Sequence, residues 1–183
     1  MLYLWIVIGI GVILLIWVIA VFNSLVKKRN RVKNAWSDID VQLKRRYDLV
    51  SNLVETVKGY KDYEASVLEN VTQARARAMS QSGLADKAQA ENALAGALKN
   101  LFAVAENYPQ LKASENFRNL QDQLASLEND IQSARRYYNA AVREFNNAIE
   151  VFPASIIAGI FGFKQFEFFG AEENEKETVK VSF

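Results

Sequence analysis

The densest group of chemically active side chains in this sequence is a basic cluster that follows an uncharged N-terminal segment. Its members all lie between positions 27 and 33: Lys27, Lys28, Arg29, Arg31 and Lys33. Such a cluster attracts anionic lipid headgroups, with about 1 kcal/mol contributed by each basic residue near the surface. The same residues would set topology beside a membrane-spanning helix. Both interpretations fit the pattern, and neither defines a specific ligand.

The side chains that most enzymes and transition-metal sites use are missing. The sequence contains no cysteine and no histidine, which excludes thiolate nucleophiles, Ser-His-Asp and Cys-His catalysis, zinc fingers and histidine-ligated metal centres. Neither of the phosphate-binding patterns GxxxxGK[ST] and GxGxxG occurs. A formal net charge of +1 gives no argument for nucleic acid as a partner. We therefore expect no enzyme activity, no cofactor, no metal and no small-molecule substrate.

Residues 2–22 form an uncharged apolar run long enough to cross a bilayer as one helix, since a hydrocarbon core about 30 Å thick needs roughly 20 apolar residues. Basic residues follow the run and none precedes it, so the positive-inside rule predicts an outside N-terminus and a cytoplasmic remainder. A cleaved signal peptide would need a charged start, a shorter core and a small-residue cleavage site, which this segment lacks. We expect residues 1–23 to be an uncleaved single-pass anchor in the inner membrane of a bacterial cell.

The residues after the anchor show the spacing of amphipathic helices. An apolar stripe predicts one long helix over about residues 24–79, with Gly59 inside it. Serine, glycine and aspartate in residues 79–86 predict a turn, and a second helix follows over about 86–107. Arg46 and Glu64 interrupt the first stripe, either as a polar layer that fixes register or as exposed positions.

A third helix has the cleanest pattern in the chain. Pro109 should end the second helix, and we expect residues 107–113 to be extended. Ser114 is a good N-cap, and the stripe from Phe117 to Phe152 keeps a 3.5-residue period for about five heptads, which predicts left-handed coiled packing. Pro153 should end this helix.

The C-terminal part begins with an apolar, phenylalanine-rich segment, residues 154–169, which is too short to span a bilayer. We expect a short fourth helix here, capping the end of the bundle far from the anchor, and disorder in the glutamate-rich residues 170–183. The predicted fold is all-α: an N-terminal transmembrane helix, then an antiparallel bundle of three long helices with a short fourth helix. The cytoplasmic bundle would comprise residues 24–169.

The predicted helix lengths leave one apolar face without a partner. At 1.5 Å per residue the three helices are roughly 80, 30 to 35 and 55 Å long, so nothing reaches back to residues 24–42. Val32, Trp36 and Ile39 nevertheless lie on one face of this segment. We predict that another chain covers it, through self-association or through docking on another membrane protein.

Two further groups of residues are candidate partner contacts. Asn107, Tyr108 and Pro109 form the clearest non-helical motif, which helix termination explains structurally and a docking loop explains functionally. Phe161 and Phe163 flank a glycine, and serve equally well as a partner motif or as an apolar end-cap. The sequence leaves both pairs of alternatives open.

Several long stretches resemble the LemA family. They include NSLVKKRNRVKNAWSDIDVQLKRRYDLV, NYPQLKA followed by ENF, and AVREFNNAIEVFPASIIAGIFGF. The resemblance covers nearly the whole chain except the acidic tail. It implies an anchor with a short outside N-terminus, a cytoplasmic helical bundle and no firmly established molecular function. One branch of the family is associated with magnetosome membrane formation, which favours a role in membrane organisation.

These observations support three functional hypotheses. The first is a membrane-anchored, non-enzymatic helical scaffold or adaptor of the LemA type. The second is a lipid-binding protein that oligomerises on the bilayer and organises it. The third is an accessory subunit of a membrane enzyme. The expected partners are membrane lipid and either a second copy of the chain or another membrane protein.

Overall fold

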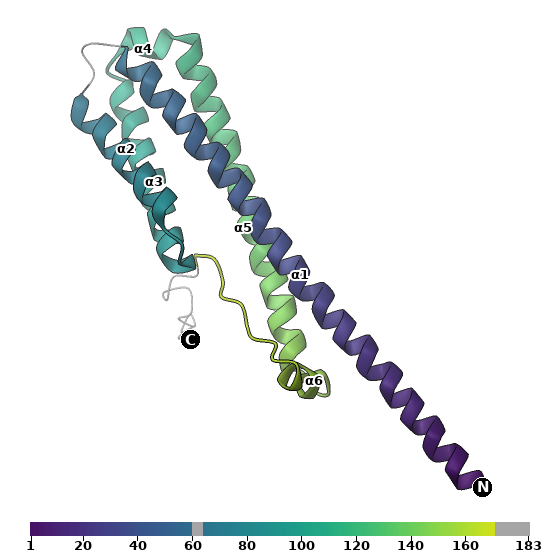
Figure 1. The fold of residues 1–183 in the computed structure, drawn as a ribbon. Helices are drawn as coiled ribbons and strands as arrows, with labels where there is room; N and C mark the ends of the chain where they lie inside the picture. Colours follow the sequence, from purple (N-terminus) through teal and green to yellow (C-terminus); the bar gives the residue numbers. More distant parts are fainter. Residues whose placement is uncertain (60–63, 171–183) are drawn as a thin grey trace, which may run out of the picture. The chain divides into compact units, whose positions relative to one another are not determined.

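The computed structural model describes residues 1–59 and 64–170, and its regular secondary structure over these ranges is α-helix, with no strand in either of them (Figure 1). The all-α prediction is confirmed. The helices of this part of the chain are α1 (Leu2–Lys58), α2 (Ala65–Ser80), α3 (Leu84–Ala105), α4 (Pro109–Ala113), α5 (Glu115–Glu150) and α6 (Ala154–Ile160). The predicted disordered tail lies, beyond Gly170, outside the described residues.

The chain divides into two compact units, and the two longest helices contribute to both. We call residues 1–37 with residues 136–167 the anchor unit. We call residues 38–135, with the segment from Phe168 onward, the hairpin unit.

The first helical turns of the anchor unit are uncovered. A window of 18 residues near the start of α1 has a mean hydropathy of 3.0, and 0% of it is buried within the chain. A core helix of a soluble protein with this composition would be mostly buried. By length and composition, the segment is therefore a candidate membrane span.

The rest of the anchor unit is built by packing α1 against the end of α5. Leu25, Val32 and Ala35 of α1 are buried, as are Val142 and Phe145 of α5. These residues repeat at intervals of three and seven, which places them on one face of each helix. Of these residues, Val32 of α1 and Phe145 of α5 belong to the apolar stripes predicted from the sequence.

The face that was expected to need a second chain is covered by the protein itself. Val32 and Ile39 are 1% and 0% exposed, and the Trp36 ring lies edge-on to Tyr138 with centroids 5.7 Å apart. The expectation of an uncovered face is wrong because it placed the end of the first helix near residue 79. α1 ends at Lys58, so the third helix is long enough to reach back to this face.

The break after Lys58 is the main departure from the predicted helix boundaries. Residues 24–79 do not form one helix: α1 ends, and α2 begins only at Ala65. Gly59 stands directly after the last residue of α1, and glycine in a helix interior costs about 1 kcal/mol relative to alanine. Val57 and Val67 are both buried, so the apolar stripe resumes after the break, and periodicity alone could not reveal it.

In the hairpin unit, α2 packs against α3. A turn at residues 81–83 joins them. The apolar side chains buried in this unit come from all four of its long segments: Leu43, Val50, Leu53 and Val57 of α1, Val67 and Val71 of α2, Leu94, Leu98 and Leu101 of α3, and Phe117, Leu124, Leu127 and Ile131 of α5.

The segment predicted to be extended, residues 107–113, instead contains the short helix α4. Pro109 occupies its first position, where a missing N–H has no cost and the fixed φ is already helical. Tyr108 before it has φ −120° and ψ 86°, as the steric demand of a following proline favours. The proline therefore begins α4, and α3 ends before it, at Ala105. Ser114 caps α5 as predicted, its Oγ accepting the Phe117 N–H at 3.4 Å.

The short helix predicted after Pro153 is present as α6, and a Schellman motif ends it. The Phe163 N–H donates to the Ala158 carbonyl at 2.9 Å, and the Gly162 N–H donates to the Gly159 carbonyl at 3.3 Å. Gly162 has φ +67°, a left-handed conformation that side chains with a Cβ rarely adopt. This turn reverses the chain and delivers Phe163 to the helices.

Two glycines of this motif provide a matched test. Both are open, with nothing within 4 Å of an added Cβ, and only Gly162 has a positive φ. We expect Gly162→Ala to destabilise the fold by about 1 kcal/mol through backbone strain. Gly159→Ala, inside α6, should be neutral or stabilising by up to about 1 kcal/mol. Thermal unfolding of the detergent-solubilised chain measures both, and equal shifts would contradict this account of the turn.

Candidate membrane-proximal site

The last residue of the uncharged run belongs to an aromatic cluster in the anchor unit. Phe22, the last residue of that run, has its ring centroid 4.7 Å from Phe161 and 5.9 Å from Phe163. The Phe163 ring is also 6.2 Å from Phe145 of α5. The rings are tilted or edge-to-face, the arrangements that aromatic quadrupoles favour. The segment after α6 therefore lies beside the end of the candidate span, and the prediction that it caps a distant end is wrong.

Residues 163–167, which we call the strap, continue this contact along α5. Asn146 bonds both backbone groups of Phe166: its Nδ2 donates to the carbonyl at 2.9 Å, and its Oδ1 accepts the N–H at 3.0 Å. The Tyr138 hydroxyl donates to the Glu167 carbonyl at 3.0 Å, and the Phe166 ring packs 5.3 Å from Phe145. Burial raises the pKa of the Tyr138 hydroxyl, which therefore stays a donor. One amide side chain thus supplies what a neighbouring strand would supply to an extended backbone.

The predicted basic cluster is partly engaged within the chain. Lys28 and Arg31 both form ion pairs with Glu144 of α5, with the Arg31 Nη1 at 2.8 Å from its Oε2. The hydrogen bond from Lys28, supported by Arg31, lowers the pKa of Glu144. The Arg29 guanidinium lies 5.3 Å from the centre of the Phe163 ring, a cation–π contact. The attraction of this cluster for anionic lipid stays a prediction.

Lys27 and Lys33, the other two members of the cluster, have exposed side chains. Glu144 offsets one of the two charges of Lys28 and Arg31. The basic charge that remains is therefore distributed around α1 just beyond the uncharged run.

The remaining candidate contacts differ in how accessible they are. Phe161 is about half exposed, and Asn107 and Pro109 in the hairpin unit are exposed, with Tyr108 half-buried. Val32 and Ile39 are buried and therefore offer no surface to a partner of the folded chain. The anchor unit brings Phe161 and Phe163 together with the basic cluster, an association that the sequence did not reveal.

The hairpin unit contains a buried polar group centred on Arg46. The Arg46 guanidinium pairs with Glu91 of α3 at 3.5 Å and with Glu128 of α5 at 3.1 Å. The Tyr47 hydroxyl donates to Glu91, and the Lys87 ammonium lies 5.4 Å from the centre of the Tyr47 ring. Arg46 is therefore part of a polar layer, one of the two readings that the sequence left open.

Glu91 and Lys87 were missed by sequence analysis although a signal existed. The stripe of α3 contains Leu94, and steps of three and four back from it land on Glu91 and Lys87. Burial raises the pKa of Glu91 more than Tyr47 and Arg46 lower it, and burial together with the bond to Glu91 raises that of Tyr47. These groups neutralise and bond one another, as buried charges must.

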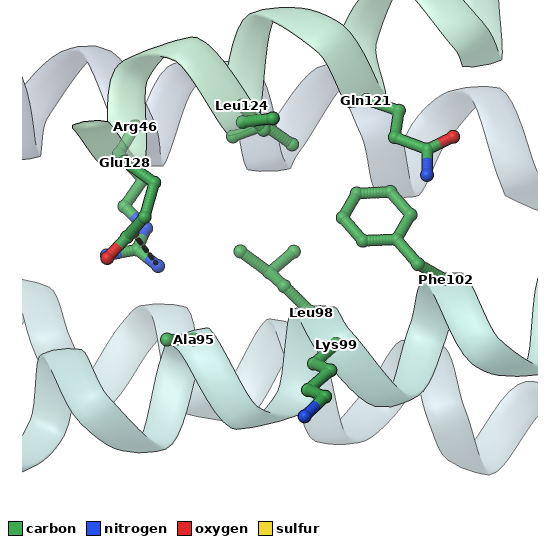
Figure 2. Close-up of a pocket in the computed structure, with 9 residues that line it drawn as sticks. Arg46, Ala95, Leu98, Lys99, Phe102, Gln121, Leu124 and Glu128 are labelled. Atoms are coloured by element: carbon green, nitrogen blue, oxygen red, sulfur yellow. Dashed lines mark ion pairs between the residues drawn. The ribbon is translucent and has the colours of Figure 1, made fainter. Parts of the chain in front are cut away.

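A groove of about 370 Å³ lies beside this polar group. Figure 2 shows Leu98 and Leu124 between the Arg46–Glu128 ion pair at one end and Phe102 with Gln121 at the other. Two carboxylates already compensate the Arg46 charge. What the groove offers a ligand is chiefly apolar contact area.

The comparisons with known proteins agree with the resemblance found in the sequence. The LemA family model matches residues 35–183. This chain belongs to the LemA family. Protein LemA of Metamycoplasma hominis is 29% identical over 165 residues, which cover 87% of this chain and 74% of that protein. The LemA match begins after the uncharged run and the basic cluster, so the family model itself does not describe the candidate span.

Two magnetosome proteins are also similar to this LemA family chain. Magnetosome protein MamQ of Magnetospirillum gryphiswaldense is 26% identical over 174 residues. Magnetosome protein MamQ 2 of Paramagnetospirillum magneticum shows the same identity over the same length. In each case the match covers 81% of this chain and 64% of the magnetosome protein, so the chain spans less than two thirds of their length.

The double hydrogen bond of Asn146 predicts a specific loss of stability in this LemA family member. Asn146→Ala would leave the N–H and the carbonyl of Phe166 without their protein partners. We expect a cost of about 1 to 3 kcal/mol and faster amide exchange in the strap. Asn147, exposed and next in sequence, is the control, and Asn147→Ala should change stability by less than about 0.5 kcal/mol. Hydrogen exchange and thermal unfolding report the difference; a strap equally protected in both variants would contradict the role of Asn146.

Proposed function

We propose that this LemA family chain is a single-pass protein of the bacterial inner membrane that serves as a non-enzymatic scaffold or adaptor. In this proposal the N-terminus lies outside and residues 24–169 form a cytoplasmic helical part. The observation that carries the proposal is the continuity of α1. One helix contains both the uncovered apolar run and the buried stripe of the anchor unit, without a linker between them.

The chemistry of the side chains supports a binding role rather than catalysis. The chain has no cysteine or histidine, and the buried charges of the hairpin unit compensate one another. A buried ion pair whose partners are fully engaged has no free group for proton transfer or nucleophilic attack. Exposed residues at the α3–α4 junction, Asn107 and Pro109, are our proposed docking surface for a protein partner.

A lipid-binding, membrane-organising protein is a second candidate function. Exposed apolar side chains around α6, such as Phe152 and Ile160, favour it. Two similar proteins are named magnetosome proteins, and these names are consistent with this second function.

Anchoring and orientation are tested by single cysteines, because the native chain has none. We expect Tyr3→Cys and Asn107→Cys chains to stay in the membrane pellet after alkaline carbonate extraction. A membrane-impermeant maleimide should label the first in intact spheroplasts and the second only after permeabilisation. An Ile10→Lys, Leu14→Lys control adds two charges to the span, each costing about 3 kcal/mol, and should release the protein. Recovery of the native chain in the supernatant would overturn the anchor, and reversed labelling would overturn the orientation.

The adaptor role is tested by photocrosslinking in living cells. We place the photoreactive residue at Asn107 and, as a control on the exposed surface of α3, at Asn100. A docking surface at the α3–α4 junction predicts a product of one discrete mass from position 107 and none from position 100. Co-expression of two differently tagged copies separates self-association from another protein. Membrane-integrated protein that gives no product from position 107 would argue against the docking surface.

A further inference from the structure

The exposed apolar side chains around α6 form a surface that a scaffold function leaves unexplained. Residues 151–163 contain no Asp, Glu, Lys or Arg. Five large apolar side chains in this segment are between 54% and 81% exposed: Val151, Phe152, Ile156, Ile160 and Phe161. Single exposed apolar residues are ordinary on protein surfaces, whereas a contiguous group marks an interaction site. We call this group the α6 patch.

The position of the α6 patch is fixed relative to the uncharged run. The Phe161 ring contacts Phe22, the last residue of that run, at 4.7 Å. The first basic residue, Lys27, follows five positions later on α1, about 7.5 Å along the helix axis. The patch therefore lies at the level where apolar surroundings must give way to charged ones.

The chemistry of the patch fits the boundary between lipid headgroups and acyl chains. A segment of this length is too short to span a bilayer and suits an interfacial location. Phenylalanines contribute both to the patch and to its attachment, and the Arg29 guanidinium covers the Phe163 ring at 5.3 Å. Glu150, the acidic residue before the patch, accepts a hydrogen bond from Gln165. Cations beside an apolar surface favour a membrane that contains anionic lipid.

We propose that the α6 patch inserts shallowly into the leaflet at which α1 leaves the membrane, as a second lipid contact beside the span. This inference rests on the proposed function, because it requires the uncharged run to cross the bilayer. Lipid is favoured over a protein partner by continuity: the patch is joined through Phe161 to Phe22, and the run that Phe22 ends lies in lipid under the proposed function. The same lipid then covers the five exposed side chains, and no protein partner is needed to bury them.

Depth-dependent fluorescence quenching tests the proposal on the full chain. Single cysteines at Phe152 and Ile160 carry an environment-sensitive fluorophore in vesicles of phosphatidylcholine and phosphatidylglycerol. Tyr137, an exposed aromatic on α5 in the same unit, is the matched control, and Ile10 reports the span. We expect lipids with a spin label near the headgroup to quench positions 152 and 160, and aqueous iodide to quench position 137. Lipids labelled deep in the acyl chain should quench position 10.

Each other outcome has a definite meaning. Iodide quenching at positions 152 and 160 as strong as at 137, with position 10 still quenched by lipid, overturns the shallow contact and leaves the anchor intact. Shielding from iodide without lipid quenching shows that protein covers the patch, and also overturns it. Absence of lipid quenching at position 10 contradicts the proposed function itself.

A charged variant tests whether apolar burial holds the patch in place. Ile156 is exposed, so Ile156→Asp should keep the helical circular dichroism of the detergent-solubilised chain. In vesicles the same substitution should abolish lipid quenching at position 152. Unchanged quenching in a correctly folded Ile156→Asp chain would overturn the proposal.

Discussion

A helix that presents apolar side chains on every face requires apolar surroundings on every side. The start of α1 is such a helix, and no other part of the described chain covers it. Aromatic rings mark the end of this run, ion pairs follow it, and the α6 patch lies at the same level. These features are consistent with one environment that changes from hydrocarbon to water along α1. The organisation of the anchor unit is the one that such a gradient would favour.

The two units achieve their cohesion by different means. Besides the apolar packing of α1 on α5, the anchor unit uses aromatic contacts and side chains that bond the backbone of the strap, with Asn146 as the clearest example. The hairpin unit buries Arg46 between two carboxylates in the middle of its apolar contacts. A buried ion pair of this kind adds little net stability, but any slip of one helix would leave a charge without a partner. Arg46 therefore favours one register of α1 against α3 and α5 over its alternatives.

Periodicity predicted most of the helical structure, and the reason is the buried stripe. The residues of α5 that the 3.5-residue pattern selected, such as Leu124, Ile131 and Phe145, are buried. The same logic failed at Gly59, because an apolar pattern on both sides of a short break does not record the break. The prediction at Pro109 also failed. Proline there predicts the end of a helix, whereas it is equally suited to the first position of one.

The candidate site could be predicted only in part. The uncharged run and the basic cluster are local features and were found directly from the sequence. The contact of Phe22 with Phe161 joins residues more than a hundred positions apart, and it depends on where α1 ends. An error of about 20 residues in that boundary therefore moved α6 to the wrong end of the predicted bundle. The predicted position of α6 therefore depended on whether the first helix ends at Lys58 or near residue 79.

The grip of the anchor unit on α1 has a mechanical consequence. Phe22 and Arg29 are seven positions apart and contact Phe163 on one face of the helix. Lys28 and Arg31 hold Glu144 on a different face. Rotation of α1 about its long axis would therefore break the contacts on at least one of these two faces. The contacts at residues 22–31 therefore set which side of the uncharged run faces the rest of the anchor unit.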